Sequence, residues 1–160
     1  MTPAKSSASR GAPSASSGAV SLPEAGDALF RSAIEACRQH ERIARCSSRG
    51  CPDDELKEMA EVCALCHRQL AARTGAWEQT AAAGQDGIDD TFWHVANALW
   101  HASREYARRH TSCDAMTVKI ARRTTDVLGA LALEYELEAS ALLALRNAVA
   151  GYRKVRGDVE

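Results

Sequence analysis

Hydrophobic residues recur along this chain at intervals of three and four, in stretches separated by glycine, proline and short polar runs. This spacing places them on one face of a helix and predicts amphipathic helices. The first helix is expected from about Ser21, where Ser21 and Glu24 have the spacing of a capping box. Its apolar face consists of Phe30, Ala33, Cys37, His40 and Ala44.

A turn over residues 46–52 follows, because glycine and proline there end one helix and permit the next. The second helix begins with acidic residues 53–55, which the helix dipole favours in a first turn. Its apolar face consists of Leu56, Met59, Cys63, Cys66 and Leu70. It is expected to end near Gly75, and residues 75–88 then form a loop in which Trp77 buries its ring.

The third helix is expected from Asp89 to about His110, and the fourth begins with Thr111 or Ser112 as its N-cap. A fourth helix that reaches Tyr152 would be about 60 Å long. We therefore expect it either to break near Gly129 or to project from the body. Its second half has an apolar face made of Leu128, Leu131, Tyr135, Leu142, Leu145, Val149 and Tyr152.

Short turns between the first and second and between the third and fourth helices imply antiparallel neighbours. The predicted fold class is all-α, an antiparallel four-helix bundle with a long fourth helix. Residues 1–21, rich in Ser, Ala, Gly and Pro, are expected to be a disordered tail. Residues 22–153 form the bundle, and residues 154–160 are a charged, frayed end.

The composition narrows the function classes. The 160 residues suit one domain, and the net charge of −1 gives no global field that would attract nucleic acid. The chain lacks the long apolar run that a membrane helix needs. The first residues carry Lys5 and Arg10 without the apolar core of a secretory signal. A reducing cytoplasm is therefore expected, where cysteines are more often free, metal-bound or redox-active than paired.

The six cysteines lie mainly on the first two helices. Folding these helices together brings Cys37 and His40 of the first near Cys63 and Cys66 of the second. Three thiols and one imidazole are a ligand set that zinc accepts, and copper(I) is the second candidate ion. The arrangement is similar in general style to the copper-storage helical bundles, which carry many more cysteines. Two other interpretations remain open: cysteines that simply fill the core, and a thiol switch or disulfide.

The same residues allow three further patterns. Cys63, Cys66 and His67 match the haem c attachment motif, which we do not favour because attachment normally needs export. The spacings Cys37-x8-Cys46 and Cys51-x11-Cys63 are those of a twin-cysteine helical hairpin, whose nested disulfides would pair Cys37 with Cys63 and Cys46 with Cys51. A four-cysteine zinc site would combine Cys46 and Cys51 with Cys63 and Cys66.

Cys113 is the candidate reactive thiol, because a cysteine in the first turn of the fourth helix has a lowered pKa. His94 and His101 are expected on a solvated face. A solvated basic cluster is expected around the turn between the third and fourth helices, consisting of Arg104, Arg108, Arg109, Lys119, Arg122 and Arg123. Glu138 interrupts an apolar face, which indicates a register break, a buried pair or a site acid.

The sequence contains no phosphate-binding glycine loop, nucleophile elbow or dinucleotide motif. We therefore predict a non-enzymatic protein that acts by protein–protein interaction, as an adaptor or through self-association by the fourth helix. The alternative is a metal-binding or thiol-sensing bundle centred on the cysteine and histidine residues of the first hairpin. Zinc or copper is the candidate ion, no organic cofactor is expected, and neither a membrane nor nucleic acid is expected as a partner.

Overall fold

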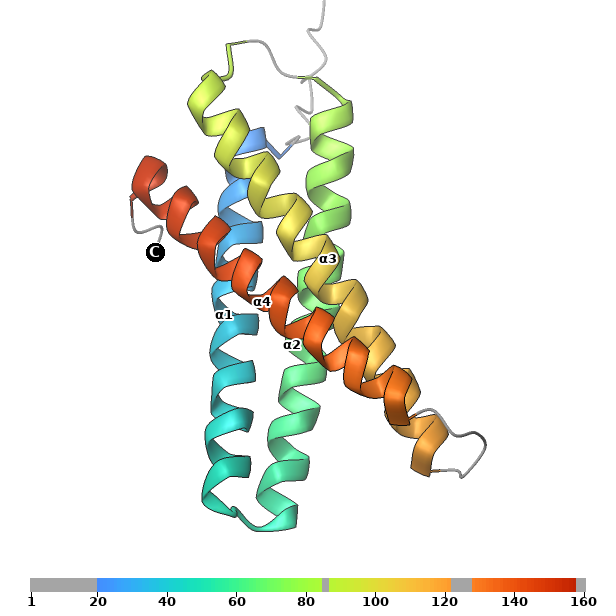
Figure 1. Ribbon diagram of the computed structural model, residues 1–160. Coiled ribbons are helices and arrows are strands. Elements are labelled where there is room, and N and C mark those ends of the chain that lie inside the picture. The colour runs from blue at the N-terminus through green and yellow to red at the C-terminus, as the bar shows by residue number, and fades with distance from the viewer. Residues whose placement is uncertain (1–19, 85–86, 122–127, 158–160) are drawn as a thin grey trace, which may run out of the picture.

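The computed structural model describes residues 20–84, 87–121 and 128–157, and in these segments all regular structure is helical. The four helices are α1 (Leu22–Arg49), α2 (Asp53–Ala82), α3 (Asp90–Ala121) and α4 (Leu128–Arg156), as Figure 1 shows. The predicted all-α, four-helix fold is confirmed. The tail predicted as disordered lies, up to residue 19, outside the described residues, as do the last three residues of the predicted frayed end.

The start of α1 forms as its sequence predicts. The Ser21 hydroxyl accepts a hydrogen bond from the Glu24 amide, and the Glu24 carboxylate accepts one from the Ser21 amide at 2.8 Å. The end of α1 is later than predicted. Gly50 caps it in the left-handed conformation (φ 71°), which only glycine adopts at low cost, so Cys46 lies inside the last turn of α1.

The predicted end of α2 at Gly75 is wrong, since α2 continues through Gly75 to Ala82. A glycine inside a helix costs about 1 kcal/mol, whereas removal of a buried Trp or Phe costs about 3–5 kcal/mol. Trp77 is 1% exposed, and its ring centroid lies 6.4 Å from that of Phe92 and 6.0 Å from that of Trp93. Burial of Trp77 is therefore confirmed, but on a helix rather than in a loop.

The predicted start of the fourth helix at residue 112 is also wrong, because residues 111–121 are the end of α3. The Thr111 hydroxyl donates to the carbonyl of Ala107 at 3.0 Å, one turn back inside the same helix, instead of capping a new one. The long predicted helix therefore divides between two elements, and α4 begins at Leu128, next to Gly129, where a break was expected.

The helices form two antiparallel hairpins, α1–α2 and α3–α4, that cross each other. Figure 1 shows α4 running diagonally over the α1–α2 hairpin, so the hairpins lie together in the upper part and separate below. Tyr152 of α4 connects the two hairpins in the upper part. Its ring stacks on that of Phe30 of α1 with centroids 5.0 Å apart, and its hydroxyl donates a hydrogen bond to Asp27 at 2.7 Å. Gly26 lets Tyr152 approach α1, because a Cβ there would lie 2.7 Å from the Tyr152 hydroxyl.

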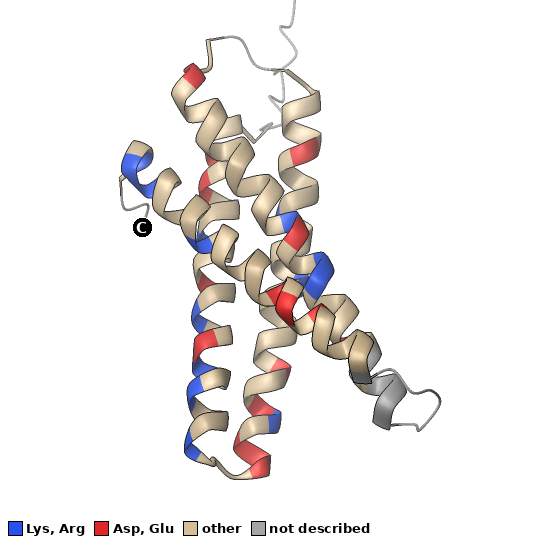
Figure 2. Ribbon diagram, viewed as in Figure 1, with Lys and Arg blue, Asp and Glu red and all other residues tan. Residues whose placement is uncertain are grey.

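Charge supports the pairing of α1 with α2 near their turn. Figure 2 shows mainly basic positions along the end of α1 and acidic positions at the start of α2. The acidic residues are those predicted for the first turn of α2, at positions 53–55. None of the helices in the described segments combines the length and hydropathy needed to cross a membrane.

Candidate metal centre

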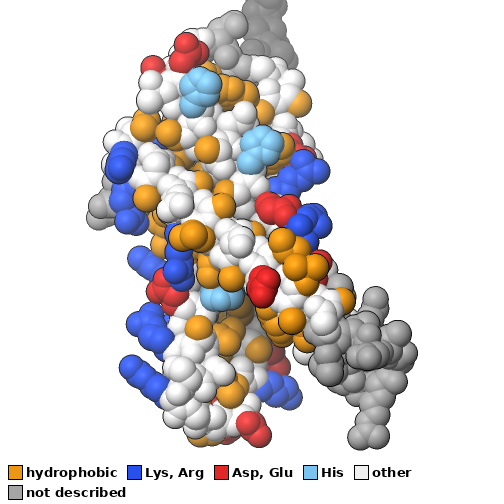
Figure 3. Space-filling view, viewed as in Figure 1, with side chains coloured by type: hydrophobic (Ala, Val, Ile, Leu, Met, Phe, Trp, Pro, Cys, Tyr) orange, Lys and Arg blue, Asp and Glu red, His pale blue; other side chains and the backbone are white. Residues whose placement is uncertain are grey.

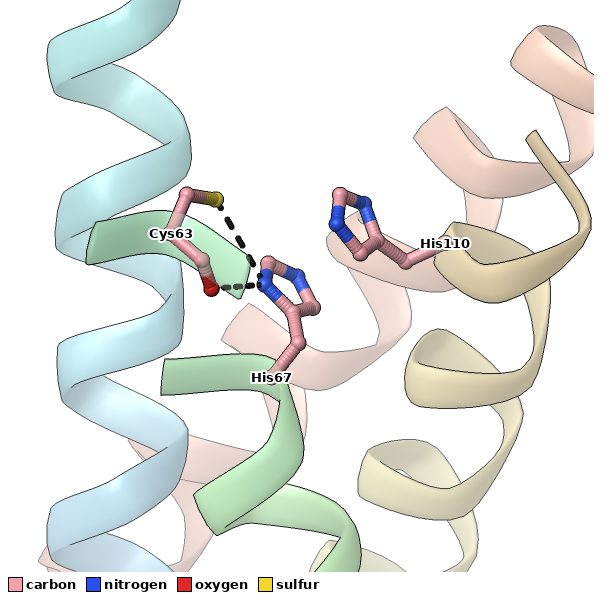
Figure 4. A group of neighbouring side chains, drawn as sticks. All are labelled: Cys63, His67 and His110. Carbon is pink, nitrogen blue, oxygen red and sulfur yellow. Dashed lines mark hydrogen bonds between the residues drawn. The ribbon is translucent and has the colours of Figure 1, made fainter. Parts of the chain in front are cut away.

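A cluster of polar side chains lies inside the bundle where the two hairpins begin to separate. Cys63 and His67 come from α2, and His110 comes from α3 (Figure 4). Each offers one ligand atom, and these three atoms lie within 4.8 Å of one another. Cys63 and His67 are 3% and 6% exposed. Glu138 of α4 approaches His110 from the other side and is itself buried, at 5% exposed.

Helix geometry explains why these residues meet. Cys63 and His67 are four residues apart, so both point from the same face of α2. His110 and Cys113 are three apart on α3, and both line the cleft of about 450 Å³ that opens where the hairpins separate. His40 of α1 lines the same cleft, and its Nδ1 lies 3.0 Å from the Tyr106 hydroxyl.

The hydrogen bonds fix the tautomers of two histidines. His67 Nδ1 lies 2.7 Å from the carbonyl oxygen of Cys63, and His110 Nδ1 lies 2.7 Å from a carboxylate oxygen of Glu138. A carbonyl and an ionised carboxylate can only accept, so each Nδ1 carries the proton and donates it. The Nε2 atom of His67 is buried and has no hydrogen-bond partner among the described residues.

Burial and charge set the ionisation of the cluster. Burial, assisted by the neighbouring His110, lowers the pKa of His67 from 6.5 to about 4. Burial pulls the pKa of Glu138 upward, but the hydrogen bond and charge of His110 outweigh it and hold the pKa below its usual value. Burial raises the pKa of the Cys63 thiol to about 11. At neutral pH His67 is therefore a neutral base and Glu138 a carboxylate.

The imidazoles of His67 and His110 stack, with centroids 3.5 Å apart and an angle of 16° between the rings (Figure 4). Two imidazolium ions at this distance would repel, so the stack requires that at least one ring is neutral. The Tyr106 ring contacts His67 from another side, with centroids 5.1 Å apart. Packing therefore holds His67 in place before any ligand binds.

The predicted quartet of Cys37, His40, Cys63 and Cys66 does not assemble. No three of these four residues have ligand atoms within 4.8 Å of one another. Cys37 belongs to the hydrophobic core, where the charge of Arg146 of α4 acts on its thiol, whereas the charge of Glu35 acts on Cys66. The two thiols therefore have different surroundings, and only Cys63 of the predicted four belongs to the group.

The nested disulfides form only in part. The inner pair, Cys46 and Cys51, is bonded, while Cys37 and Cys63 of the outer pair are free. The bond also removes two ligands from the predicted four-cysteine zinc site. The bond joins the last turn of α1 to the residue just before the Pro52 N-cap of α2, across a separation of five residues.

The predicted position of Cys113 in the first turn of a helix is wrong, because Cys113 lies well inside α3. It is 2% exposed, and burial together with the charge of Glu138 raises its pKa to about 12. A protonated, buried thiol is a poor nucleophile. Cys113 is therefore a neighbour of the polar cluster and not an activated thiol.

Two predictions about exposed residues are confirmed, in that His94 and His101 are exposed on α3. The members of the predicted basic cluster whose side chains the structure describes, Arg104, Arg108 and Arg109, lie along α3. Arg108 and Arg109 both bind Glu105, and Arg109 also binds Glu134 of α4 at 3.2 Å. The Lys119 side chain and residues 122–123 lie outside what the structure describes.

The sequence patterns do not point to His67 and His110 as partners. In the sequence His67 is the last residue of the haem c motif, and His110 lies at the predicted end of the third helix. The spacings Cys63-x3-His67 and His110-x2-Cys113 each place two ligand types on one helix face, and this was the available signal. Glu138 did carry a signal as an acid on an apolar face, and it forms the buried pair that was one of its three interpretations.

Comparisons of the chain with protein-family models, with curated proteins and with solved structures gave no match.

Proposed function

We propose that this protein is a helical bundle that binds a transition-metal ion of the zinc class through Cys63, His67 and His110. The observation that supports this most directly is the convergence of their three ligand atoms within 4.8 Å at a largely buried position. Cysteine and histidine are the ligands zinc uses most, and they bind it at about 2.0–2.3 Å. Two atoms bound to one such ion lie about 3–4 Å apart, so atoms within 4.8 Å of one another need only a small adjustment to share an ion.

The hydrogen bonds of the two histidines support a metal more than an ordinary polar core. A histidine that binds a metal commonly donates its other N–H to a carbonyl or a carboxylate, which orients the ring. His67 donates from Nδ1 to the Cys63 carbonyl, and His110 donates from Nδ1 to Glu138. An unpaired buried polar atom such as His67 Nε2 costs about 1–3 kcal/mol, and a bound cation would remove this cost.

Binding requires two adjustments that can be measured. The lone pair of an imidazole lies in the ring plane, so one of the stacked rings must rotate for both to bind the same ion. The Cys63 thiol must lose its proton, because thiolate is the form that binds metal. We therefore expect metal affinity to rise with pH, and one proton to be released for each ion bound.

Two ions fit the donor set, and one experiment distinguishes them. One sulfur and two imidazole nitrogens suit zinc, and they are also the donors of trigonal copper(II) sites. We propose zinc, because thiolate and imidazole are the ligands that zinc uses most in proteins. Competition between Zn²⁺ and Cu²⁺ in buffered titrations measures the preference.

Cobalt(II) substitution tests the site itself. Titration of the metal-free full chain with Co²⁺ should give tetrahedral ligand-field bands and a thiolate-to-cobalt charge-transfer band. Cys63→Ser should remove the charge-transfer band. Cys66→Ser is the matched control, because Cys66 lies on the same helix and is equally buried but outside the group. No cobalt binding, or equal loss in both variants, would refute the proposed site.

A second proposal, association through α4, is favoured by exposed apolar side chains. Leu133, Tyr135 and Leu143 are 56%, 49% and 59% exposed, and Figure 3 shows apolar side chains gathered where α4 crosses the molecule. Self-association would cover them. Light scattering after size exclusion tests this proposal: a monomer at high concentration, unchanged by Leu143→Glu, would refute it. We further propose a reducing, cytoplasmic location, in which the Cys46–Cys51 bond would be reduced and Cys63 would stay free to bind metal.

A further inference from the structure

A second cleft, of about 360 Å³, lies between α2 and α3. Its lining includes both histidines of the candidate metal centre, His67 and His110. Alanines at positions 64, 71 and 107 also line it, and their small side chains leave room between the two helices. A molecule in this cleft therefore reaches the histidines directly.

The charged residues of this cleft are mostly basic. Arg68 comes from α2 and Arg104 and Arg108 from α3, against one carboxylate, that of Asp114. Figure 2 shows basic positions on α3 where it runs beside α2. Arg108 is neutralised by Glu105, which accepts two hydrogen bonds from its guanidinium at 2.7 and 3.0 Å. The charges of the other two arginines decide what the cleft attracts.

Arg68 and Arg104 are available to a ligand. Arg104 makes one long contact with Glu78, at 3.8 Å, and its guanidinium lies 5.5 Å from the centroid of the Trp100 ring. Arg68 makes no ion pair with another residue of the described segments. Guanidinium groups bind phosphate through two parallel N–H donors, and two of them match the double negative charge of a phosphate group.

We propose that the α2–α3 cleft binds a small phosphate-bearing molecule, with one phosphate oxygen on the bound metal and the others on Arg68 and Arg104. This inference rests on the proposed metal site. Within the described residues only three ligand atoms converge, which leaves a coordination position for an external ligand, as in zinc sites that bind small molecules. Asp114 is 65% exposed and lies outside the converging group, so it leaves that position open.

Phosphorus NMR on the cobalt-loaded full chain tests the proposal, with inorganic phosphate as the probe and cobalt kept below one equivalent. Cobalt(II) broadens the phosphate line only when phosphate lies close to it, so we expect saturable broadening. Arg68→Gln/Arg104→Gln should weaken phosphate binding at least fivefold and leave the cobalt absorption spectrum unchanged. Arg38→Gln/Arg45→Gln is the matched control, because it removes two exposed arginines from α1 far from the cleft.

The outcomes separate the two proposals. Absence of cobalt binding would refute the metal site and with it the coordinated phosphate. Cobalt binding with a phosphate line that stays sharp would refute the phosphate site alone. Equal phosphate affinity in the cleft variant and the α1 control would also refute it, because the arginines of the cleft would then contribute nothing beyond their charge.

Discussion

His67 gives a prediction whose magnitude follows from its burial. It is 6% exposed, and its pKa is lowered from 6.5 to about 4 in the folded protein. In the unfolded chain we expect the ordinary histidine value, near 6.5. As the pH falls, the unfolded chain therefore takes up this proton before the folded protein does, and the free energy of unfolding decreases. The decrease lies between about pH 7 and pH 4, and it ends once both states are protonated.

The size of the effect follows from the same two pKa values. Between pH 7 and pH 5 the linkage amounts to about 2 kcal/mol for this one residue. Urea unfolding followed by circular dichroism, with a chelator present, measures it at both pH values. The pKa of His40 is also lowered by burial, and this contribution remains in both proteins that are compared. The quantity of interest is therefore the difference between wild type and His67→Gln.

We expect wild type to lose about 2 kcal/mol more than His67→Gln between pH 7 and pH 5. His94→Gln is the control, because His94 is exposed on α3 and outside the cluster, and this variant should behave as wild type does. If wild type and His67→Gln lose the same stability, protonation of His67 is not opposed by the fold. The inference that His67 is a buried, neutral imidazole, on which the proposed metal site depends, would then be wrong.

Three further predictions concern other parts of the molecule. Glu138→Gln should weaken Zn²⁺ binding about 10–100-fold in competition with a chromophoric chelator, because the carboxylate orients His110, whereas exposed Glu136→Gln should not. Gly26→Ala should lower the free energy of unfolding by about 1–3 kcal/mol, because the new Cβ would lie 2.7 Å from the Tyr152 hydroxyl. Gly75→Ala should raise the free energy of unfolding by about 0.5–1 kcal/mol, because a Cβ at Gly75 has no neighbouring atom within 4 Å. If Gly26→Ala were the stabilising variant and Gly75→Ala the destabilising one, the described packing would be wrong. Cys46→Ser/Cys51→Ser should cost about 2 kcal/mol in urea unfolding, from closure of one short loop, and leave cobalt binding intact.

The sequence determined the elements of this fold more securely than their ends. Apolar periodicity predicted four helices, and the Ser21–Glu24 capping box predicted where the first begins, since a cap depends only on residues within one turn. The errors came where a local stop signal competed with packing. Gly75 and Ser112 both look like helix boundaries, and at Gly75 the burial of Trp77 outweighs the local cost.

The candidate site shows the same division between local pattern and tertiary contact. Periodicity places Cys37, Cys63 and Cys66 on apolar faces, and all three are buried. It does not say which residue of another helix each one meets. That depends on the crossing angle of the hairpins and on how far α3 extends before it ends, and neither leaves a local trace in the chain.

The sequence by itself therefore determined an all-helical chain with cysteine and histidine on its inner faces. Only the tertiary structure decided that Cys63 and His67 meet His110 of α3, that Glu138 orients His110, and that Cys37 stays in the core. The physical reason is the separation along the chain over which each kind of interaction acts. Capping and periodicity act over one or two helical turns, whereas a site built from three helices depends on contacts between residues far apart in the chain.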